Sequence, residues 1–470
     1  MPYQDLRDYL SALEKAGKLK RITKEVDKDW EISAVGRIAF QTIPEAERPA
    51  LLFENVKNFP IPVTLGVLGG SRAIYALALE TTPQGVAEKW RAALTNPIDP
   101  VEVPSGVCQE NVLDGEAVDL SIIPVPVWTP GEDPGPYLTA PFIFTKDPET
   151  GIQNIGTYRC EIKSKNRIAM WSNYFMHGRK HIEMNNQNNQ PTPVAIVLGT
   201  DPAVGLTSVA RFAYGMDELA VAGGLRKEPI KIVKCRTNDL LVPASAEIVL
   251  EGEIRPNALE KEGPFGEFTG YMGAIADSFI IDIKCMTYRN NPIYQAFLSQ
   301  MPPSESSCIR SISWENAIYQ HLAKDLHLPI KDVHLLESGG AMAYLAISMK
   351  KDREGSVKQA MLGAWAYAPT VGKITVIVDE DIDIRDPFQL NWAMSFRVQP
   401  LKDVIIMPDV ASVDLDPSQA DYEVGQNDPV RRTSSKLGID ATKKHHYPPI
   451  ALPPKQHLED VRARWSEYWR

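Results

Sequence analysis

The sequence is poor in cysteine, and the few cysteines that it has are scattered. Its 470 residues contain five, an odd number, at positions 108, 160, 235, 285 and 308. No two of them form a Cys-x-x-Cys pair. Because a disulfide framework and a thiolate zinc site both need paired, closely spaced cysteines, the sequence indicates neither. We expect a protein whose thiols stay reduced.

Long apolar runs are also missing. No stretch of about 20 residues is apolar enough to span a bilayer. The first residues, Met-Pro-Tyr-Gln-Asp, lack the basic and then apolar region of a secretion signal. We therefore expect a cytoplasmic protein with no membrane partner.

Basic residues form no concentrated block. Lysine and arginine number 50 against 60 acidic residues, which gives a formal net charge of −10. A protein that binds nucleic acid needs a basic surface, so the composition argues against nucleic acid as the main partner. A small acidic substrate stays open, because one local arginine can hold a carboxylate against an overall negative field. Hydrophobic residues at 44% and charged residues at 23% are ordinary for a soluble globular enzyme.

The length predicts two or three domains. Helix and strand patterns predict a mixed α/β unit over 1–110. Prolines are dense between 100 and 141 and exclude helix and central strand there, so this segment is either a linker or an ordered wall of a site. From 142 to 288 the pattern is mostly that of strands, with one helix expected at 216–223, and is typical of a barrel-like domain.

After residue 302 strand and helix patterns alternate, which predicts a layered α/β domain. We expect strands at 333–336, 344–349 and 374–378, the last as a buried parallel strand, and helices at 311–325 and 356–368. A closing helix over 457–469 has an apolar stripe, which predicts packing on the body or on a neighbouring subunit. The expected divisions are 1–110, 111–310, 311–450 and a C-terminal helix in 451–470.

The stretch 262–267, Glu-Gly-Pro-Phe-Gly-Glu, places two carboxylates around a tight turn. Its glycines can take positive φ, and its proline fixes one φ near the value of a turn. Such a turn holds Glu262 and Glu267 in a set relation, as acid–base chemistry requires. An acidic surface loop has the same pattern, and from spacing alone it is the commoner explanation.

Three other residues could bind a hard divalent cation. Asn154, His177 and Glu218 offer oxygen, nitrogen and oxygen, a set that suits Mn²⁺ or Mg²⁺ rather than a thiophilic metal. Each also has a simpler explanation, as a turn residue, a packed histidine or an exposed helix glutamate. His181 competes with His177 for any role on that segment. Spacing alone does not show that the three side chains meet.

Taken in order, these pieces resemble the UbiD family of decarboxylases, which use prenylated FMN. The resemblance runs along nearly the whole chain, and the hexapeptide at 262–267 is its most specific part. It rests on Asp5-Leu6-Arg7 with Gly17, Asn154 to Arg159, His177-Gly178-Arg179, Asp217-Glu218 before Ala222-Gly223-Gly224, Glu262 to Glu267, Met301 to Glu305, Trp392-Ala393 to Arg397, and Lys436 to Thr442.

The resemblance implies a multidomain α+β and α/β fold. A split β-barrel over 111–310 would bind prenylated FMN and a metal, and an α/β domain over 311–450 would build a homo-oligomer, a dimer or a hexamer. Asn154, His177 and Glu218 match the ligands of a divalent metal, usually Mn²⁺ and otherwise Mg²⁺. Thr207 and Ser208 resemble residues beside a K⁺ site. The residues that match cofactor contacts are Asn154, Ile155, Gly156, Thr157, Tyr158, Arg159, Met176, His177, Glu218 and Lys436.

Lys436 matches a lysine that pairs with the cofactor phosphate, and Met176 stands where several relatives have glutamine. Arg159, Glu262 and Glu267 match the catalytic network of the family. Glu267 would be the proton donor, with its pKa raised by burial and by Glu262, which Arg159 keeps ionised.

The implied reaction is the reversible, non-oxidative decarboxylation of an aromatic or heteroaromatic acid to CO₂. The substrate expected is a hydroxylated or heterocyclic monoacid, and a separate flavin prenyltransferase would supply the cofactor. Arg310, His327, His445 and His446 could each contact a ring substituent and are assigned no role. Two alternatives stay open, a flavin-binding reductase or carrier without this chemistry and a metal-dependent hydrolase.

Overall fold

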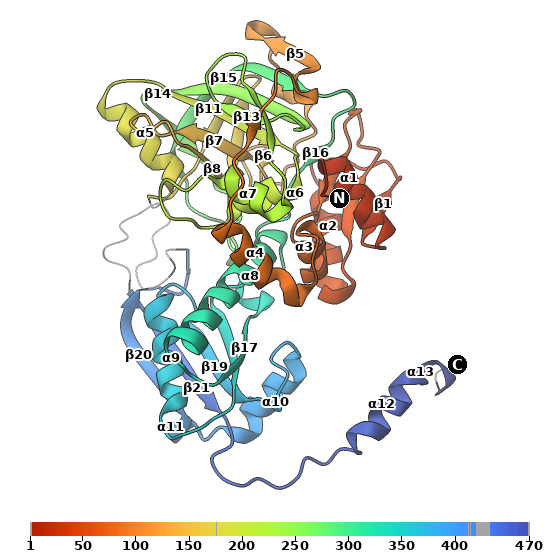
Figure 1. Ribbon diagram of the computed structural model, residues 1–470, viewed down its shortest axis with the longest axis vertical. Coiled ribbons are helices and arrows are strands. Elements are labelled where there is room, and N and C mark those ends of the chain that lie inside the picture. Colours follow the sequence, from red (N-terminus) through yellow and green to blue (C-terminus); the bar gives the residue numbers. More distant parts are fainter. Residues whose placement is uncertain (1, 175, 412, 414, 420–432, 469–470) are drawn as a thin grey trace.

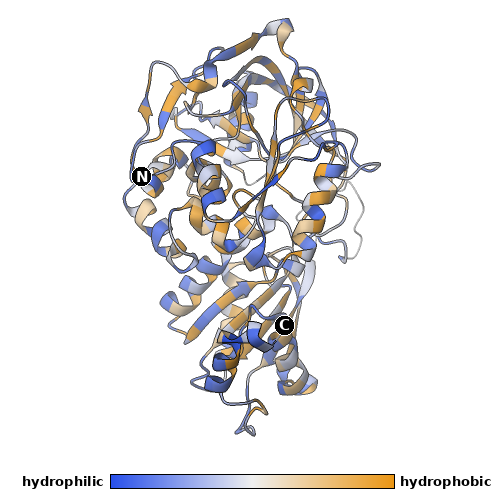
Figure 2. Ribbon diagram, turned by 90° about the vertical axis from the view of Figure 1, so that its right-hand side faces the viewer, coloured by the Kyte–Doolittle hydropathy of each residue, from blue (hydrophilic) through white to orange (hydrophobic). Residues whose placement is uncertain are grey.

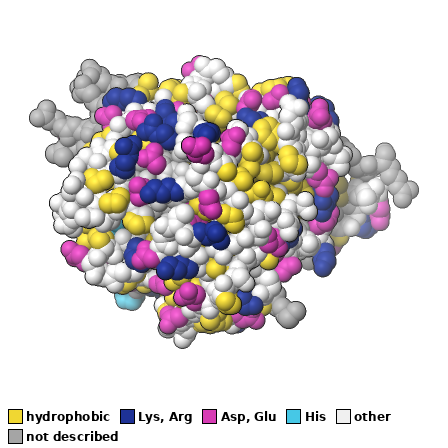
Figure 3. All heavy atoms as spheres, turned by 90° about the horizontal axis from the view of Figure 1, so that it is seen from above, with side chains coloured by type: hydrophobic (Ala, Val, Ile, Leu, Met, Phe, Trp, Pro, Cys, Tyr) yellow, Lys and Arg dark blue, Asp and Glu magenta, His cyan; other side chains and the backbone are white. Residues whose placement is uncertain are grey.

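The computed structural model describes residues 2–468 apart from 175, 412, 414 and 420–432. The fold is mixed α/β with several domains, as the sequence predicts, and its largest sheet curls into a half-barrel (Figure 1). Hydrophobic residues follow the strands of the barrel and of the C-terminal sheet (Figure 2). On the face above the barrel, acidic and basic side chains are interspersed and form no large patch of one sign (Figure 3).

The N-terminal unit has a four-stranded sheet in the order β1-β2-β3-β16. Asp5 caps its first helix, and Gly17 follows that helix with a φ of +66°. The buried side chains of this helix recur at helical spacing, as predicted. The elements are α1 (Leu6–Lys15), β1 (Leu19–Ile22), α2 (Glu31–Thr42), β2 (Ala50–Phe53), β3 (Val63–Leu65), α3 (Arg72–Ala78), α4 (Val86–Thr95) and, from far along the chain, β16 (Tyr294–Gln295).

The proline-dense segment is packed against the barrel rather than free. Trp128 is buried, and its indole N–H donates to the backbone oxygen of Tyr137 at 2.9 Å. Both Trp128 and Thr129 donate backbone N–H groups to Asp133 Oδ2, at 2.9 and 2.7 Å. The segment contains the short strands β4 (Val101–Glu102), β5 (Asn111–Asp114) and β6 (Tyr137–Leu138) and three single-turn 3-10 helices. It therefore forms an ordered wall.

The barrel is a nine-stranded antiparallel sheet. Its main path is β6-β9-β10-β15-β14-β11-β7-β8, and β5 pairs with β15. β8 lies at one edge of this order and β9 lies next to the other edge, yet only Tyr158 and Arg159 separate them in the chain. The sheet must therefore curl until its two sides meet at Arg159. The remaining strands are β7 (Phe142–Lys146), β8 (Gln153–Thr157), β9 (Cys160–Ser164), β10 (Arg167–Met170), β11 (Thr192–Leu198), β14 (Ile248–Glu262) and β15 (Ala276–Tyr288).

Three helices lie within the barrel region, where the sequence analysis expected one. The expected helix is α7 (Glu218–Arg226), and the expectation that it stands alone was wrong because α5 (His177–Gln187) and α6 (Pro202–Val209) are also present. Residues 202 to 208 of α6 are all buried, so this helix has no polar face to reveal a period. A separate small sheet joins β4 to β12 (Lys231–Lys234) and β13 (Leu241–Pro243).

The C-terminal domain is a five-stranded sheet in the order β17-β18-β19-β21-β20. β19 pairs in parallel with β18 and with β21, which confirms the prediction of a buried parallel strand. α8 starts six residues before the predicted 311, where Ser304 caps it. The elements are α8 (Glu305–Gln320), β17 (Ile330–Leu335), β18 (Tyr344–Met349), α9 (Ser356–Tyr367), β19 (Ile374–Asp379), α10 (Pro387–Arg397), α11 (Pro400–Asp403), β20 (Val404–Ala411) and β21 (Thr433–Ala441).

The chain ends in α12 (Lys455–Ala463) and α13 (Trp465–Tyr468). These helices bury no residue and stand away from the body (Figure 1). Of the two expected placements, packing on the body of the same chain does not occur in the described residues, and Trp469, part of the predicted stripe, lies outside them. In the part of the chain that the structure describes, no helix combines the length and apolarity needed to cross a membrane.

Glu305 joins the N-terminal unit to α8. Its fully buried carboxylate accepts backbone N–H groups from Gly66 at 2.7 Å, Leu68 at 2.9 Å and Gly69 at 3.2 Å. We expect Glu305→Gln to lower the free energy of unfolding by about 3 kcal/mol, because the amide N–H₂ group would face these donors. Thermal unfolding measures the effect against the exposed control Glu354→Gln. Equal midpoints for the two variants would contradict this role.

Candidate active site

Arg159, Glu262 and Glu267 meet where the two sides of the barrel come together. Arg159 Nε donates to Glu262 Oε1 at 2.9 Å, and Arg159 Nη2 donates to Glu262 Oε2 at 3.1 Å. Arg159 Nη1 donates to Glu267 Oε1. Glu262 is the last residue of β14, whereas Glu267 follows the turn. One guanidinium therefore binds the two carboxylates that the sequence analysis grouped with it.

Aromatic rings enclose this guanidinium. It lies 4.9 Å from the centre of the Trp171 ring and 5.5 Å from that of Phe265. Tyr137 stacks on Phe265 with ring centres 4.3 Å apart. The sequence analysis gave these three residues no role. Phe265 lies inside the hexapeptide and Trp171 begins an aromatic stretch, but neither pattern indicates contact with an arginine. Rings packed against the guanidinium exclude water and strengthen the ion pairs.

The two carboxylates sit in different environments. Burial raises the pKa of Glu267, and the nearby Glu262 raises it further, while Arg159 opposes both. Glu262 is fully buried and receives two hydrogen bonds from the guanidinium. Burial disfavours the Arg159 cation, but Glu267 and Glu262 outweigh this and raise the pKa of the guanidinium. Glu267 is thus the carboxyl that can hold a proton to a higher pH than usual.

The turn between the two glutamates is tightly built. Gly263 has a φ of +96°, which favours glycine, and a Cβ on Gly266 would come within 2.8 Å of the Gln300 side chain. The backbone N–H of Glu267 donates to the oxygen of Tyr271 at 2.8 Å. This turn holds the Glu267 side chain toward Arg159.

Asn154, His177 and Glu218 come together at the other candidate centre. One end of the Asn154 side-chain amide lies 3.2 Å from Glu218 Oε1 and 3.3 Å from His177 Nδ1. The three residues come from β8, the start of α5 and the start of α7. A cavity opens beside them, lined by Tyr214 and Met216 among others. The convergence that spacing could not show is therefore present.

His181 lines the same cavity, but of the two histidines it is His177 that lies within hydrogen-bond distance of the Asn154 amide. His181 is buried, and its Nδ1 lies 2.9 Å from Thr145 Oγ1. Burial lowers the pKa of His181 to about 4, so the ring is neutral near pH 7. Burial also lowers the pKa of His177, and the nearby charge of Lys180 lowers it further. A neutral imidazole is the form that binds a metal.

The chemistry of these donors fits a divalent cation. Glu218 is buried, and burial raises its pKa to about 8, because its hydrogen bonds from backbone N–H groups compensate its charge only in part. With its nitrogen toward them, the Asn154 amide donates to Glu218 Oε1 and His177 Nδ1, and with its oxygen toward them the three residues present the oxygen and nitrogen ligands that a divalent cation prefers. Within the described ranges no cluster of three or more His, Cys, Asp or Glu residues could hold a metal, so a site here depends on the asparagine.

The residues expected to hold the cofactor fall into two groups. Asn154 to Arg159 form the end of β8 and the crossing to β9, and Met176 and His177 lie at the start of α5. Thr157 Oγ1 lies 3.0 Å from Ser208 Oγ, which brings the segment with Thr207 to the same place. A phosphate beside this cradle would meet the cation site directly.

Lys436 is not brought to these residues. It is buried in β21, donates to the backbone oxygen of Val371 at 2.6 Å and lies 6.0 Å from the Trp365 ring. Burial lowers the pKa of its ammonium to about 8. Within the part of the chain that the structure describes, these side-chain contacts of Lys436 lie in the C-terminal domain.

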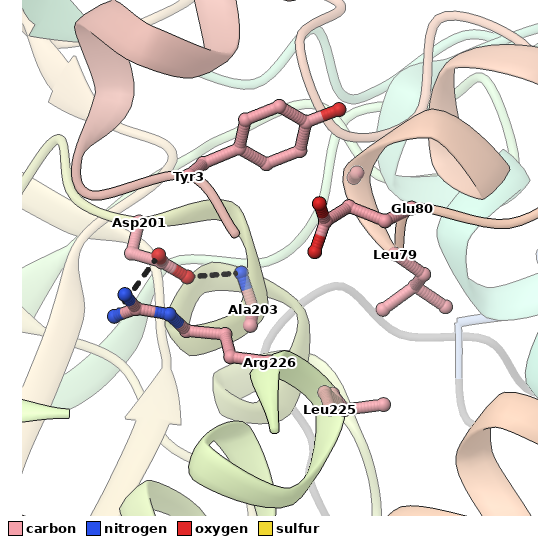
Figure 4. Close-up of a pocket in the computed structure, with 8 residues that line it drawn as sticks. Tyr3, Leu79, Glu80, Asp201, Ala203, Leu225 and Arg226 are labelled. Carbon is pink, nitrogen blue, oxygen red and sulfur yellow. Dashed lines mark hydrogen bonds and ion pairs between the residues drawn. The ribbon is translucent and has the colours of Figure 1, made fainter. Parts of the chain in front are cut away.

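A separate buried ion pair fixes the helices of the cradle. Arg226, at the end of α7, lies 3.4 Å from Asp201 Oδ2, while Asp201 Oδ1 accepts the backbone N–H of Ala203 at 2.7 Å in α6 (Figure 4). Tyr3 and Glu80 line the same small cavity. The pair ties the helix that carries Ser208 to the helix that carries Glu218.

Comparison with protein families gives matches along the chain in three consecutive parts. Residues 10–94 match the N-terminal domain, residues 100–302 the Rift-related domain and residues 310–441 the C-terminal domain of 3-octaprenyl-4-hydroxybenzoate carboxy-lyase. An uncharacterized protein of Synechocystis, sll0936, is 33% identical over 99% of this chain and 96% of its own length.

Solved structures give the same result. HmfF of Pelotomaculum thermopropionicum, a UbiD-class enzyme solved with FMN, superposes with a TM-score of 0.86 at 33% identity, over 97% of this chain and 99% of that one. An evolved dimeric form of HmfF was solved with prFMN and has a TM-score of 0.83 at 33% identity, over 96% of this chain and 97% of that one. The apo 3,4-dihydroxybenzoic acid decarboxylase AroY of Klebsiella pneumoniae has a TM-score of 0.86 at 27% identity, over the full length of both chains.

Proposed function

The chain belongs to the UbiD family of carboxy-lyases, and from this we propose that it releases CO₂ from an aromatic or heteroaromatic carboxylic acid with prenylated FMN bound. One observation carries the proposal, the binding of Glu262 and Glu267 to the single guanidinium of Arg159. The match of a prFMN complex to this chain supports the cofactor. The reverse reaction, carboxylation at high bicarbonate, belongs to the same proposal.

The proposed roles of the three residues follow from their environments. Arg159 holds Glu262 in place through two hydrogen bonds and orients the acid carboxylate of the substrate beside it. Glu267, the carboxyl with the raised pKa, delivers a proton to the carbon that has lost CO₂. The prenylated flavin, when bound, supplies the electron sink for the pair that CO₂ leaves behind.

We propose that Asn154, His177 and Glu218 hold Mn²⁺ or Mg²⁺, and that this ion binds the cofactor phosphate. A phosphate carries nearly two negative charges and needs such a cation. Ile155, Gly156, Thr157, Tyr158 and Met176 would line the cofactor, with K⁺ near Thr207 and Ser208. Lys436 lies in the C-terminal domain. It would pair with the phosphate only if that domain closed over the site.

The remaining partners are proposals from the family. A flavin prenyltransferase would supply the cofactor, and the chain would form a homo-oligomer, a dimer or a hexamer, in the cytoplasm. The functional divisions proposed are an N-terminal unit at 1–110, the cofactor domain at 111–310, the oligomerisation domain at 311–450 and the C-terminal helix. A substrate with its carboxylate on the ring is favoured over a cinnamic-type acid.

Mass spectrometry of the bound ligand separates the three classes of function. The protein would be produced together with a flavin prenyltransferase and its cofactor released by denaturation. Prenylated FMN is the expected result. Plain FMN alone, despite the prenyltransferase, would favour a reductase or a carrier, although such a protein has no need of two paired glutamates. Absence of any flavin, with a divalent metal still bound, would favour a metal-dependent hydrolase.

We expect the turnover of the loaded enzyme to fall as the pH rises through the raised pKa of Glu267. A proton donor must be protonated, and burial raises the pKa of Glu267, so the acid form persists above the usual range of a carboxyl. Above this raised pKa the group is ionised and cannot donate, whereas below it kcat is level. A profile of kcat against pH checks the direction, and a kcat that climbs steadily with pH would contradict it.

A further inference from the structure

Arg310 is a guanidinium without a matching acid. It lies in the second turn of α8 and its guanidinium carbon sits 4.5 Å from the centre of the Phe268 ring. Among the described residues its side chain makes one hydrogen bond, a long one from Nη1 to the backbone oxygen of Gly340 at 3.4 Å. Across the residues that the structure describes, no carboxylate lies within ion-pair distance of it. Burial lowers its pKa to about 10, and the charge of the nearby Glu267 offsets this only in part.

A second arginine, which is exposed to solvent, lies near it. Arg211 is exposed on the loop before α7, and its guanidinium stacks 5.4 Å from the ring of Trp314. Trp314 follows Arg310 by one turn of α8, so both cations lie along one face of this helix. Arg211 is close enough to disfavour the charge of Arg310, and it too has no ion pair within the described part of the chain. An anion bound at Arg310 would therefore also be attracted by Arg211.

Arg310, the less exposed member of this pair of arginines, lies near the proposed proton donor, Glu267. Phe268, on which Arg310 stacks, is the residue after Glu267, and the charge of Arg310 acts on the Glu267 carboxyl. On its other side Glu267 meets Arg159, whose charge Glu262 and Glu267 already compensate. The free positive charge beside the proton donor is therefore at Arg310 rather than at Arg159.

We propose that Arg310, with Arg211 beside it, binds a second carboxylate of the substrate, so that the preferred substrate is a ring dicarboxylate. The inference rests on the proposed function and replaces the monoacid expected from the sequence with a diacid. The carboxylate that leaves lies on the side of Arg159 and Glu267. The one that stays meets Arg310, whose planar fork can bind it with two hydrogen bonds. A neutral ring substituent would leave the charge of both arginines uncompensated.

Equilibrium binding tests this directly. The full chain loaded with plain FMN would be titrated by calorimetry with benzoate and with the 1,2-, 1,3- and 1,4-benzenedicarboxylates. One diacid is expected to bind about 10- to 100-fold more tightly than benzoate, as one charge-assisted contact allows. Arg310→Gln should remove that advantage and leave benzoate affinity unchanged, and Arg310→Lys should restore part of it. The exposed Arg255→Gln, whose arginine pairs with Asp282, is the matched control.

The outcomes divide cleanly. No diacid advantage in the wild-type chain, or an advantage that survives in Arg310→Gln, overturns the proposal. Equal loss of benzoate and diacid binding in Arg310→Gln shows a structural role instead and also overturns it. If Arg310→Gln does not fold, the wild-type comparison and Arg310→Lys still decide. Because binding to the FMN form needs no chemistry, a decarboxylase that fails on every acid would refute the proposed function alone.

Discussion

Replacing Glu267 by glutamine is expected to abolish turnover while the cofactor stays bound. The amide can still accept the hydrogen bond that Arg159 donates, so the geometry of the turn is kept. It cannot deliver a proton, and the loss of a general acid lowers the rate by about 10²- to 10⁴-fold. Two measurements follow the loss, the rate of CO₂ release and the incorporation of solvent deuterium at the vacated carbon. Flavin absorbance shows that the site is still loaded.

A matched control separates this effect from a general change of charge. Glu260 lies on the same strand as Glu262, is partly exposed and pairs with Arg167. Glu260→Gln should keep near-native turnover because its side chain takes no part in the Arg159 network. Near-native decarboxylation by Glu267→Gln would show that another group is the acid.

Removing a ligand of the metal is expected to remove metal and cofactor together. In His177→Ala or Glu218→Ala the proposed ion loses one of three protein ligands, and the phosphate loses the cation that bridges it to the protein. Metal content by inductively coupled plasma mass spectrometry and flavin content by absorbance should both fall from near stoichiometric to near zero.

Two exposed residues supply the controls for this pair. His445→Ala and Glu228→Ala remove the same side-chain types from the surface and should change neither metal nor flavin content. A metal-free Glu218→Ala protein with full cofactor occupancy would show that the ion does not bridge the phosphate. The three residues would then form a hydrogen-bonded cluster with the Asn154 nitrogen toward its neighbours.

The strands and helices that the sequence predicted best are those whose burial follows a simple period. The run at 374–378 is apolar except for Thr375 and forms most of β19, which is paired on both sides. α6 has the opposite property, since it is buried all round and its composition does not distinguish it from a strand. α5 is rich in asparagine and other polar residues, and its sequence gives only a weak helical signal. Tertiary packing, not local preference, decides both.

The residues of the candidate site also differ in how far the sequence could predict their arrangement. The glutamates of the hexapeptide are close in sequence, so their relation to one another could be predicted from a turn. The meeting of Asn154, His177 and Glu218 depends on how the barrel curls and on two helices around it, which no spacing encodes. The sequence also named Arg310 without a role, because the absence of an acidic partner is a property of the folded chain.

Decarboxylation by three forms of the same protein tests the central claim most directly. The chain would be prepared with prenylated FMN, with plain FMN and without flavin. Each form would be given hydroxybenzoates, dihydroxybenzoates, benzenedicarboxylates, and pyrrole, furan, indole and fused-ring carboxylates, with cinnamate as the contrast. We expect CO₂ from one class of ring acid with the prenylated form alone, and deuterium from D₂O at the vacated carbon. Equal release from all three forms, or none from any acid with prenylated FMN bound, would contradict the account.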